Sequence, residues 1–384
     1  MIRSMVFKLQ MSARHGRQFE AAMQHLNDLY NAALQERIEA WSKNKVSITK
    51  FDQMKSLTII RRENPDFTRF ATTMQRSVLV QVDEAFKGFF SRIKKGGPVG
   101  FPRFRSIKRV RSFSFTEASG WKIKDGRLYM KGLPSIRLKI HRPTERQMLK
   151  LIIKKRATSW VAIIVTKLQD VFGPVCSGAK GYDLGITDIV TDSNGIGYGT
   201  INPERSSASK RKKTEQALAR QKPGSRKRRK TQKRLSRQRQ REANSRKTAH
   251  FQKASEIVRS AGGILVLEKL QNKNMMRSAR GSIEKPGTNV AAKSGLNRSL
   301  ADSSLSQFTK ILVDKAESAG RLVIFVDPRN TSQNCSACDI KVAKTLAQRR
   351  HVCGCGLDIG RDHNAAINIL NRGVVAAGRR SLAA

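Results

Sequence analysis

The segment 205–250 places the strongest constraint on how this chain can fold. It holds nineteen Lys or Arg residues against two Glu residues, with few apolar positions. Like charges at this density repel one another and leave too little apolar surface for a core. The rest of the chain must therefore supply the domain that carries the segment. It is either a solvated linker or a helical hairpin laid along a phosphate backbone, and the hairpin is favoured because phosphates would neutralise its charge.

The whole chain of 384 residues is also strongly cationic. Its formal net charge is +47, yet 39% of its residues are hydrophobic, which is enough for a folded protein. Such a protein needs a polyanionic partner, and nucleic acid is favoured because each neutralised phosphate releases counterions. An anionic membrane surface is the alternative. No run of 18 apolar residues exists, and the N-terminal MIRSMVFKLQ lacks the apolar core of a signal peptide.

Hydrophobic periodicity divides the first part of the chain into strands and helices. Residues 5–11 alternate between apolar and polar side chains, which predicts a strand. Apolar residues then recur every three or four positions over 17–42, which predicts an amphipathic helix. Further helices are expected at about 49–63 and 73–95, and the Gly-Gly-Pro at 96–98 ends the last of them.

Strand signals return after a basic segment that is interleaved with aromatic residues. Phe113 and Phe115, the Asp-Gly turn at 125–126, the stretch 135–141 and the β-branched run 160–166 predict a small antiparallel barrel. Because the helices lie between the first strand and these later ones, we expect one domain to be interrupted by another.

A second unit is expected to begin near residue 175, with Cys176 as a core thiol. Apolar runs and turn residues predict its elements in chain order. They are a strand around Gly181–Ile186 with a turn at Asn194-Gly195, a helix at about 250–261, a strand at 264–268, a mobile loop at 272–300, a helix at about 303–319, a strand at 322–326 and a helix at 362–371.

Four of the five cysteines lie in the short stretch 335–355, whereas a secreted disulfide framework would spread them through the chain. This favours a reducing cytoplasm and a metal site. The pairs Cys335-Ser-Ala-Cys338 and Cys353-Gly-Cys355 match a four-thiolate zinc ribbon, and His351 is a substitute ligand. Such a site is structural, since four protein ligands leave no coordination position open. Incidental buried thiols are the alternative.

Three acids lie where the ends of elements can converge. Asp183 lies within an apolar strand, Glu268 ends another strand, and Asp362 begins a helix whose dipole favours an anion. Two Mg²⁺ ions about 4 Å apart hydrolyse phosphodiesters when a few carboxylates converge on them. Taken singly, each acid has a plainer role: Asp362 as a helix cap, Glu268 as a solvated turn residue and Asp183 as the partner of a Lys or Arg.

Five motifs in order along nearly the whole chain resemble those of the TnpB nucleases, which insertion sequences encode and which are small relatives of type V CRISPR effectors. The motifs are GFPRFRS at 100–106, GYDLGIT at 181–187, VLEKL at 266–270, TSQNCSACD at 331–339 and RDHNAAINIL at 361–370. The resemblance implies that Asp183, Glu268 and Asp362 are the catalytic acids and the ligands of two Mg²⁺ ions. The nearby acids Asp188 and Asp358 do not match the motif positions.

The resemblance also implies an α/β multidomain fold built on an RNase H-like (RuvC) core. The implied domains are a wedge β-barrel at 1–11 and 97–168, a helical recognition domain at 12–96, a RuvC-like nuclease domain at 175–329 and 358–371 that includes the basic helical segment 205–250 and the mobile loop 272–300, a zinc ribbon at 330–357 and a flexible tail at 372–384. The chain departs from the family pattern in its shortened second cysteine pair and at Gly360, where many relatives carry an acid.

By the same resemblance, the chain would bind a guide RNA transcribed from the end of its transposon and cleave double-stranded DNA next to a short flanking motif. Base pairing would supply the specificity. We expect a monomer on RNA, acting in a prokaryotic cytoplasm on nucleoid DNA. A guided repressor without cleavage, a transposase or transposase accessory protein and a basic RNA-binding protein of ribosomal type are the alternatives.

Contacts with nucleic acid are expected on the polar face of the helix at 73–95, on the basic loop after it and in the basic segment. Exposed Gln and Arg side chains on a helix are usually only solvated, which is the alternative. The residues expected to make these contacts are Gln75, Arg76, Gln81, Arg103, Arg105, Arg228 and Arg229.

Overall fold

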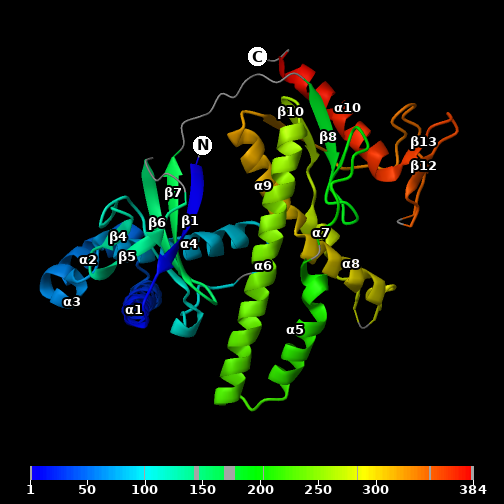
Figure 1. Ribbon diagram of the computed structural model, residues 1–384. Coiled ribbons are helices and arrows are strands. Elements are labelled where there is room, and N and C mark those ends of the chain that lie inside the picture. Colours follow the sequence, from blue (N-terminus) through cyan, green and yellow to red (C-terminus); the bar gives the residue numbers. More distant parts are fainter. Residues whose placement is uncertain are drawn as a thin grey trace. The chain divides into compact units, whose positions relative to one another are not determined.

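The computed structural model divides the chain into two compact units, Met1–Asp170 and Val171–Ala384 (Figure 1). Cys176, expected as a core thiol, is not among the residues that the structure describes. None of the helices in the described part of the chain is long and apolar enough to cross a membrane. The structure describes residues 2–98, 100–141, 147–167, 178–201, 203–282, 284–345 and 347–381.

The first unit contains an antiparallel sheet that forms a nearly closed barrel. Its order is β2-β6-β7-β1-β5-β4-β3. The expected Asp-Gly turn joins β3 to β4, with positive φ at both Asp125 (51°) and Gly126 (70°), as a tight hairpin turn requires. The strands are β1 (Ile2–Gln10), β2 (Ser112–Phe115), β3 (Trp121–Lys124), β4 (Arg127–Met130), β5 (Leu133–Lys139), β6 (Met148–Lys155) and β7 (Trp160–Lys167).

Helices inserted between β1 and β2 share the core of this sheet. Ser12 caps the first helix by accepting a hydrogen bond from the backbone N–H of His15 (3.2 Å), and Thr49 forms a capping box with Asp52 at the second. The apolar faces of α1 and α4 and the inner face of the sheet bury one continuous cluster. The helices are α1 (Ala13–Asn44), α2 (Lys50–Glu63), α3 (Pro65–Thr68), α4 (Thr72–Lys94) and the short 3-10 helix η1 (Ile107–Arg109).

The second unit is built on a mostly parallel sheet of order β11-β10-β8-β9, in which only β9 runs antiparallel to its neighbour. A separate pair, β12 and β13, lies in the cysteine-rich segment. The strands are β8 (Ala179–Asp183), β9 (Thr191–Asp192), β10 (Ile264–Glu268), β11 (Leu322–Val326), β12 (Arg350–Val352) and β13 (Asp358–Gly360), and the helices are α5 (Pro203–Ala219), α6 (Arg226–Ser260), α7 (Asn272–Met275), α8 (Val290–Ser303), α9 (Leu305–Ser318) and α10 (Arg361–Ser381).

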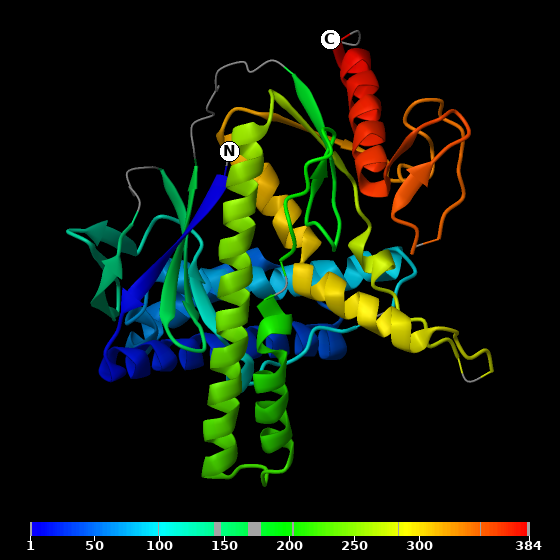
Figure 2. The ribbon, with the colours of Figure 1, turned by 45° about the vertical axis from the view of Figure 1, so that its right-hand side comes forward.

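Helices cover both faces of the parallel sheet (Figures 1 and 2). Successive strand residues point to opposite faces, and β10 shows the result. Leu265 and Leu267 belong to the core formed with α6 and α9, whereas Val266 packs with Ile369 of α10. The sheet is therefore the middle layer, with α6 and α9 on one side and α10 on the other.

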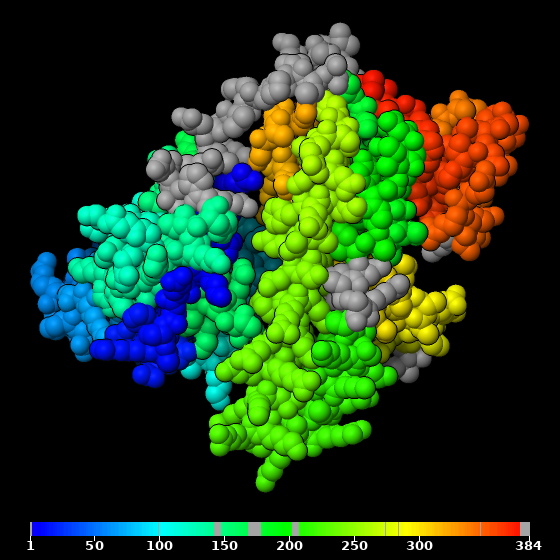
Figure 3. Space-filling model, in the orientation of Figure 1, coloured from blue at the N-terminus to red at the C-terminus, as the bar shows by residue number. Residues whose placement is uncertain are grey.

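The basic segment is helical, and α5 packs against α6 along its length. Much of one side of α6 is exposed to solvent (Figure 3). Between the helices, the buried Glu242 pairs with the guanidinium of Arg211 (2.8 Å) and accepts a hydrogen bond from Ser207. At the turn, the Arg228 guanidinium donates to the carbonyl oxygen of Gln221 (2.8 Å). A few internal ionic contacts thus hold together a hairpin that has little apolar core.

Two segments differ from the expectation. Residues 290–300, expected within a mobile loop, belong to α8, whose Leu300 is buried in the core of the unit. Residues 372–381, expected as part of a flexible tail, continue α10 to Ser381. This helix continues because Gly373 lies directly against Val266 of the sheet, where a Cβ atom would come within 2.4 Å of the valine side chain. Tertiary contacts override weak local signals at both places.

Glycine 181 sets how closely α10 approaches the sheet. A Cβ atom at this position would lie 2.2 Å from the carbonyl oxygen of Ala366 and 2.6 Å from the backbone nitrogen of Leu370. Both are backbone atoms of α10 and cannot rotate away. Only a residue without a side chain allows the helix to lie this close to β8, two residues before Asp183.

We expect Gly181→Ala to lower the free energy of unfolding by about 2 kcal/mol or more, because the helix must move away from the sheet. Gly295→Ala is the matched control, since Gly295 lies in α8, where an added Cβ atom would have no neighbouring atom within 4 Å, and it should tolerate or slightly favour alanine. Urea denaturation of both variants measures the difference. Equal stability of the two variants would contradict the close packing of α10 on β8.

Candidate functional site

Asp183 and Glu268 end neighbouring parallel strands, β8 and β10, and the register of these strands makes the two acids neighbours across the sheet. Adjacent strands lie about 4.8 Å apart. Two residues earlier on each strand, Gly181 and Val266 contact α10. Because side chains alternate along a strand, both carboxylates belong to the sheet face that α10 covers.

Asp362 lies in the first turn of α10, so its carboxylate is near the positive end of the helix dipole. Burial, followed by the charges of Glu268 and Asp362, raises the pKa of Asp183 to about 8, and the neighbouring Arg361 partly opposes this. The Arg361 guanidinium also pairs with Asp362 (3.4 Å). The structure thus brings Glu268 and Asp362, which are distant in sequence, near Asp183, and their charges disfavour its ionisation.

Glu268 is buried and is held by a residue from outside the sheet. Its carboxylate accepts a hydrogen bond from the Thr331 hydroxyl, which lies just before the first cysteine pair. Burial raises the pKa of Glu268, while the Thr331 hydrogen bond and the charge of Arg372 oppose the rise. The Thr331 contact fixes one carboxylate oxygen, so the ribbon segment helps to orient the second acid.

Two asparagines of α10 bind the same loop. The Asn368 amide donates to the carbonyl oxygens of Thr331 (2.9 Å) and Asn334 (2.8 Å), and the Asn364 amide donates to that of Asn334 (2.8 Å). In return, the backbone N–H of Ser336 donates to the Asn364 side chain (2.9 Å). Sequence reasoning did not single out these residues. Their spacing of four residues, which places both on one face of a helix, was the available signal.

The four predicted cysteines converge at the end of this loop. Their sulfur atoms all lie within 4.8 Å of one another, with Cys335 3.6 Å from Cys355 and Cys338 3.6 Å from Cys353. Tetrahedral zinc–thiolate bonds of about 2.3 Å place sulfur atoms roughly 3.8 Å apart, so the spacing fits one zinc ion. The shortened second pair therefore does not prevent convergence. Within the described part of the chain, the three carboxylates do not close to such a spacing.

The surroundings favour the thiolate form of Cys335, whereas burial and the neighbouring cysteine sulfur atoms raise the pKa of Cys338. Burial raises the pKa of the Cys335 thiol, but hydrogen bonds from the backbone N–H groups of Cys338 and Ala337 outweigh burial and lower it to about 6. His351 is buried beside the cluster, with its Nδ1 next to the Lys344 ammonium. The four sulfur atoms form a complete ligand set, so His351 is not needed as a substitute ligand.

We expect the purified protein to carry about one zinc ion per chain, as a four-thiolate site requires. Cys353→Ser should abolish most of this zinc and lower the melting temperature, because the loop that holds Thr331 and the α10 asparagines would lose its anchor. Metal analysis and thermal unfolding measure both effects. Ser336→Ala, within the same loop, is the control and should retain the zinc. A fully zinc-loaded Cys353→Ser protein would exclude the four-thiolate site.

The raised pKa of Asp183 predicts how stability depends on pH in metal-free buffer. Folded Asp183 holds its proton up to pH about 8, whereas the unfolded residue loses it near its ordinary value of 3.8. The folded state therefore binds more protons between these values, and stability falls by up to ~1.4 kcal/mol for each pH unit gained. We expect Asp183→Asn to remove this fall.

Denaturation at a series of pH values tests this expectation. The stability of Asp183→Asn relative to the wild type should grow as the pH rises toward 8. Asp358→Asn is the control, because Asp358 is an exposed acid paired with Arg350 (2.9 Å), and it should not show this growing advantage. A constant difference between Asp183→Asn and the wild type would mean that Asp183 is ionised throughout.

The residues expected to contact nucleic acid differ in exposure. Gln75 is fully buried, and its side-chain amide contacts Arg61, the Phe67 carbonyl oxygen and His25. It therefore does not lie on the exposed face of α4 as expected, because α2 and α3 pack over it. Arg76 and Gln81, on the same helix, are partly exposed.

The predicted arginines also divide into two kinds. Arg105 lies over the Tyr30 ring (3.2 Å from guanidinium carbon to ring centre) and donates to the Gln81 side chain (2.9 Å), so it anchors its loop to α1 and α4. The Arg228 guanidinium donates to the Gln221 carbonyl oxygen at the turn of the α5–α6 hairpin. Arg103 and Arg229 are exposed. The exposed arginines remain predictions for contact with phosphate.

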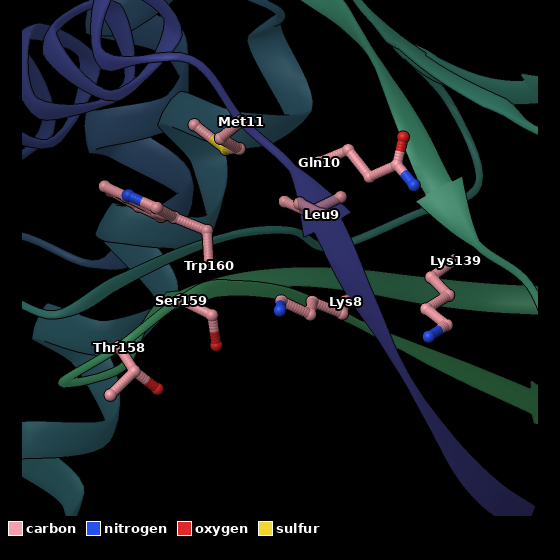
Figure 4. Close-up of a pocket in the computed structure, with 8 residues that line it drawn as sticks. All are labelled: Lys8, Leu9, Gln10, Met11, Lys139, Thr158, Ser159 and Trp160. Carbon is pink, nitrogen blue, oxygen red and sulfur yellow. The ribbon is translucent and has the colours of Figure 1, made fainter. Parts of the chain in front are cut away.

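A hollow of about 500 Å³ lies at one end of the barrel in the first unit (Figure 4). Its lining includes Lys8, Lys139 and Trp160, together with the hydroxyls of Thr158 and Ser159. It contains no carboxylate, so it does not offer the oxygen ligands that hard divalent cations require. It therefore differs in chemistry from the candidate site that the three acids of the second unit form.

Comparison with known families adds to these observations. The OrfB_IS605 model, described as "Probable transposase", matches residues 178–279, which include Asp183 and Glu268. The model described as "Cas12f1-like, TNB domain" matches residues 306–369, which include the four cysteines and Asp362. The cryo-EM structure of a Cas12f1–sgRNA–target DNA complex contains a chain with the same fold. Its TM-score is 0.60 at 14% identity, covering 94% of this chain and 83% of that one.

Curated relatives extend over most of the chain. InsQ of Escherichia coli strain K12, which carries the name of a candidate RNA-guided DNA endonuclease, is 27% identical over 308 residues, or 78% of this chain and 74% of InsQ. A similarly named protein of Streptomyces pristinaespiralis is 24% identical over 357 residues, or 91% and 84% of the two chains. These matches agree with the resemblance to the TnpB family that the five motifs carry.

Proposed function

We propose that the chain is an RNA-guided DNA endonuclease that hydrolyses phosphodiester bonds at a site formed by Asp183, Glu268 and Asp362. The observation that carries this proposal is the electrostatic coupling of these acids, which come from two adjacent strand ends and one helix start. Under the proposal, the sheet with α6, α9 and α10 is an RNase H-like (RuvC) core. The RNA-guided relatives and the Cas12f1 fold support the same reading.

The three carboxylates fit hard divalent cations such as Mg²⁺, which prefer oxygen ligands. Two bound ions would supply an activated water and stabilise the leaving oxygen. The chain's own contribution is to hold like charges together. Asp183 must release its proton before it can act as a ligand, and Thr331 fixes one oxygen of Glu268 so that the other can face the ions. The positive end of α10 favours anionic groups at this place.

RNA guidance is supported by the chain's charge and by its relatives. A guide RNA, a heteroduplex and a displaced DNA strand present far more phosphate than a single protein-binding site on DNA, which suits a net charge of +47. We propose that the guide comes from the transposon end, that the first unit contains the wedge and recognition domains, and that it reads a short motif next to the target. The α5–α6 hairpin would lie along a phosphate backbone.

We expect the purified protein, with its guide RNA and Mg²⁺, to cleave matching double-stranded DNA. Asp183→Ala and Asp362→Ala should lower the cleavage rate by at least about a thousandfold, because the remaining acids cannot hold the ions, while DNA binding persists. Gel-based cleavage and mobility-shift assays measure the two activities. Asp358→Asn, which changes an exposed acid four residues before Asp362, is the matched control and should cleave normally.

The same assays separate the alternatives. Binding of matched DNA without cleavage by the wild type would favour a guided repressor. Cleavage that needs no RNA would favour a transposase, in line with the description of the matching OrfB_IS605 model, or an unguided nuclease. Wild-type cleavage by both alanine variants would exclude the three acids as the catalytic site. Sequencing of the co-purified RNA identifies the guide.

A further inference from the structure

Phenylalanines, two of them exposed and two half-buried, gather at the end of α4 and in the loop after it. We define this aromatic patch as Phe86, Phe89 and Phe90 of α4 together with Phe101. The Phe101 ring centre lies 5.2 Å from that of Phe89 and 5.8 Å from that of Phe86, both edge to face. The Phe90 ring contacts Phe89 (5.1 Å) and stacks near Phe86 (6.4 Å). The rings thus hold one another in fixed orientations.

Two rings of the aromatic patch are open to solvent. Phe90 is 54% exposed and Phe101 48% exposed, and residues 91–95 are all exposed. The loop is fixed to the helix by a hydrogen bond from the Arg92 guanidinium to the Gly100 carbonyl oxygen (2.7 Å). Large apolar rings displayed on a rigid, exposed element are typical of an interaction surface.

Charge indicates which partner suits this surface. Residues 87–109 contain eight Lys or Arg residues and no Asp or Glu. A second copy of this chain would bring equal positive charge and be repelled, whereas a nucleic-acid backbone would be attracted. Double-stranded nucleic acid hides the faces of its bases, so rings that stack need an unpaired strand. Aromatic side chains among cations are the usual means of binding such a strand.

We propose that the aromatic patch binds unpaired nucleobases by stacking, while the surrounding Lys and Arg residues hold the phosphates. The surface deepens the proposed function, because a guided nuclease keeps at least one strand unpaired. Its test uses neither guide nor cleavage, so its failure and that of the proposed function are distinguishable.

The experiment compares two single strands of equal length and charge. One is an oligothymidylate of about twelve nucleotides, and the other is an abasic strand with the same number of phosphates. Fluorescence anisotropy at moderate salt gives both affinities for the full-length protein. We expect the wild type to prefer the thymidine strand by about tenfold, since one well-stacked base contributes about that factor.

The double variant Phe90→Leu/Phe101→Leu keeps apolar bulk but removes both rings. It should lose most of this preference while binding the abasic strand as tightly as the wild type does. Phe51→Leu is the matched control, because Phe51 is 64% exposed on α2 beside Lys50 but lies outside the aromatic patch. It should keep the preference. A double variant with the wild-type ratio, or one equally weakened on both strands, would overturn the proposal.

Two further measurements guard against misfolding and against a different partner. Phe90→Trp should bind normally, and its added tryptophan fluorescence should be quenched by the thymidine strand but not by the abasic strand. Absence of this difference would also overturn the proposal. Sedimentation of the wild type and the double variant tests whether a second copy of the chain binds the aromatic patch instead. Self-association that the double variant loses would assign the surface to contacts between copies of the chain.

Discussion

The contact between α10 and β8 is the constraint on which the candidate site depends. Gly181 lets two backbone segments meet where any side chain would overlap the Ala366 carbonyl oxygen. That approach places the first turn of α10, with Asp362, on the sheet face that holds Asp183 and Glu268. Close packing transmits displacement rather than absorbing it. A small shift of this helix would therefore separate one acid from the other two without changing any of the three.

The cysteine-rich loop is the second support of the acids. It reaches Glu268 through Thr331 and is held from the other side by Asn364 and Asn368. The cysteine cluster, which could hold a zinc ion, is thus connected to the carboxylates by a short chain of hydrogen bonds. Under the proposed function, this loop would orient Glu268 as the outer-shell partners of other metal centres orient their ligands. The hydrogen bonds through Thr331 also explain why the cysteine cluster and the three acids lie in neighbouring segments.

Local patterns predicted much of the fold, because strands, turns and caps depend on nearby residues. The Asp-Gly turn at 125–126 and the strand 264–268 are examples. The residues that sequence reasoning missed depend on tertiary contacts. Thr331 gains its role only when β10 and the cysteine loop meet, and Gln75 is buried because α2 and α3 pack over a face that its own helix cannot specify. The length of α10 likewise depends on the contact between Gly373 and Val266.

The acids themselves could be located from motif context, but not from periodicity, since each fits a cap, turn or ion pair equally well. The structure adds that the acids lie close enough for their charges to raise the pKa of Asp183. Burial and mutual repulsion oppose the ionised state of Asp183, and the fold tolerates this because Arg361 and the α10 dipole offset part of the cost. A cation bound between these carboxylates would relieve the remaining repulsion. Under the proposed function, divalent ions would complete the neutralisation that Arg361 only begins.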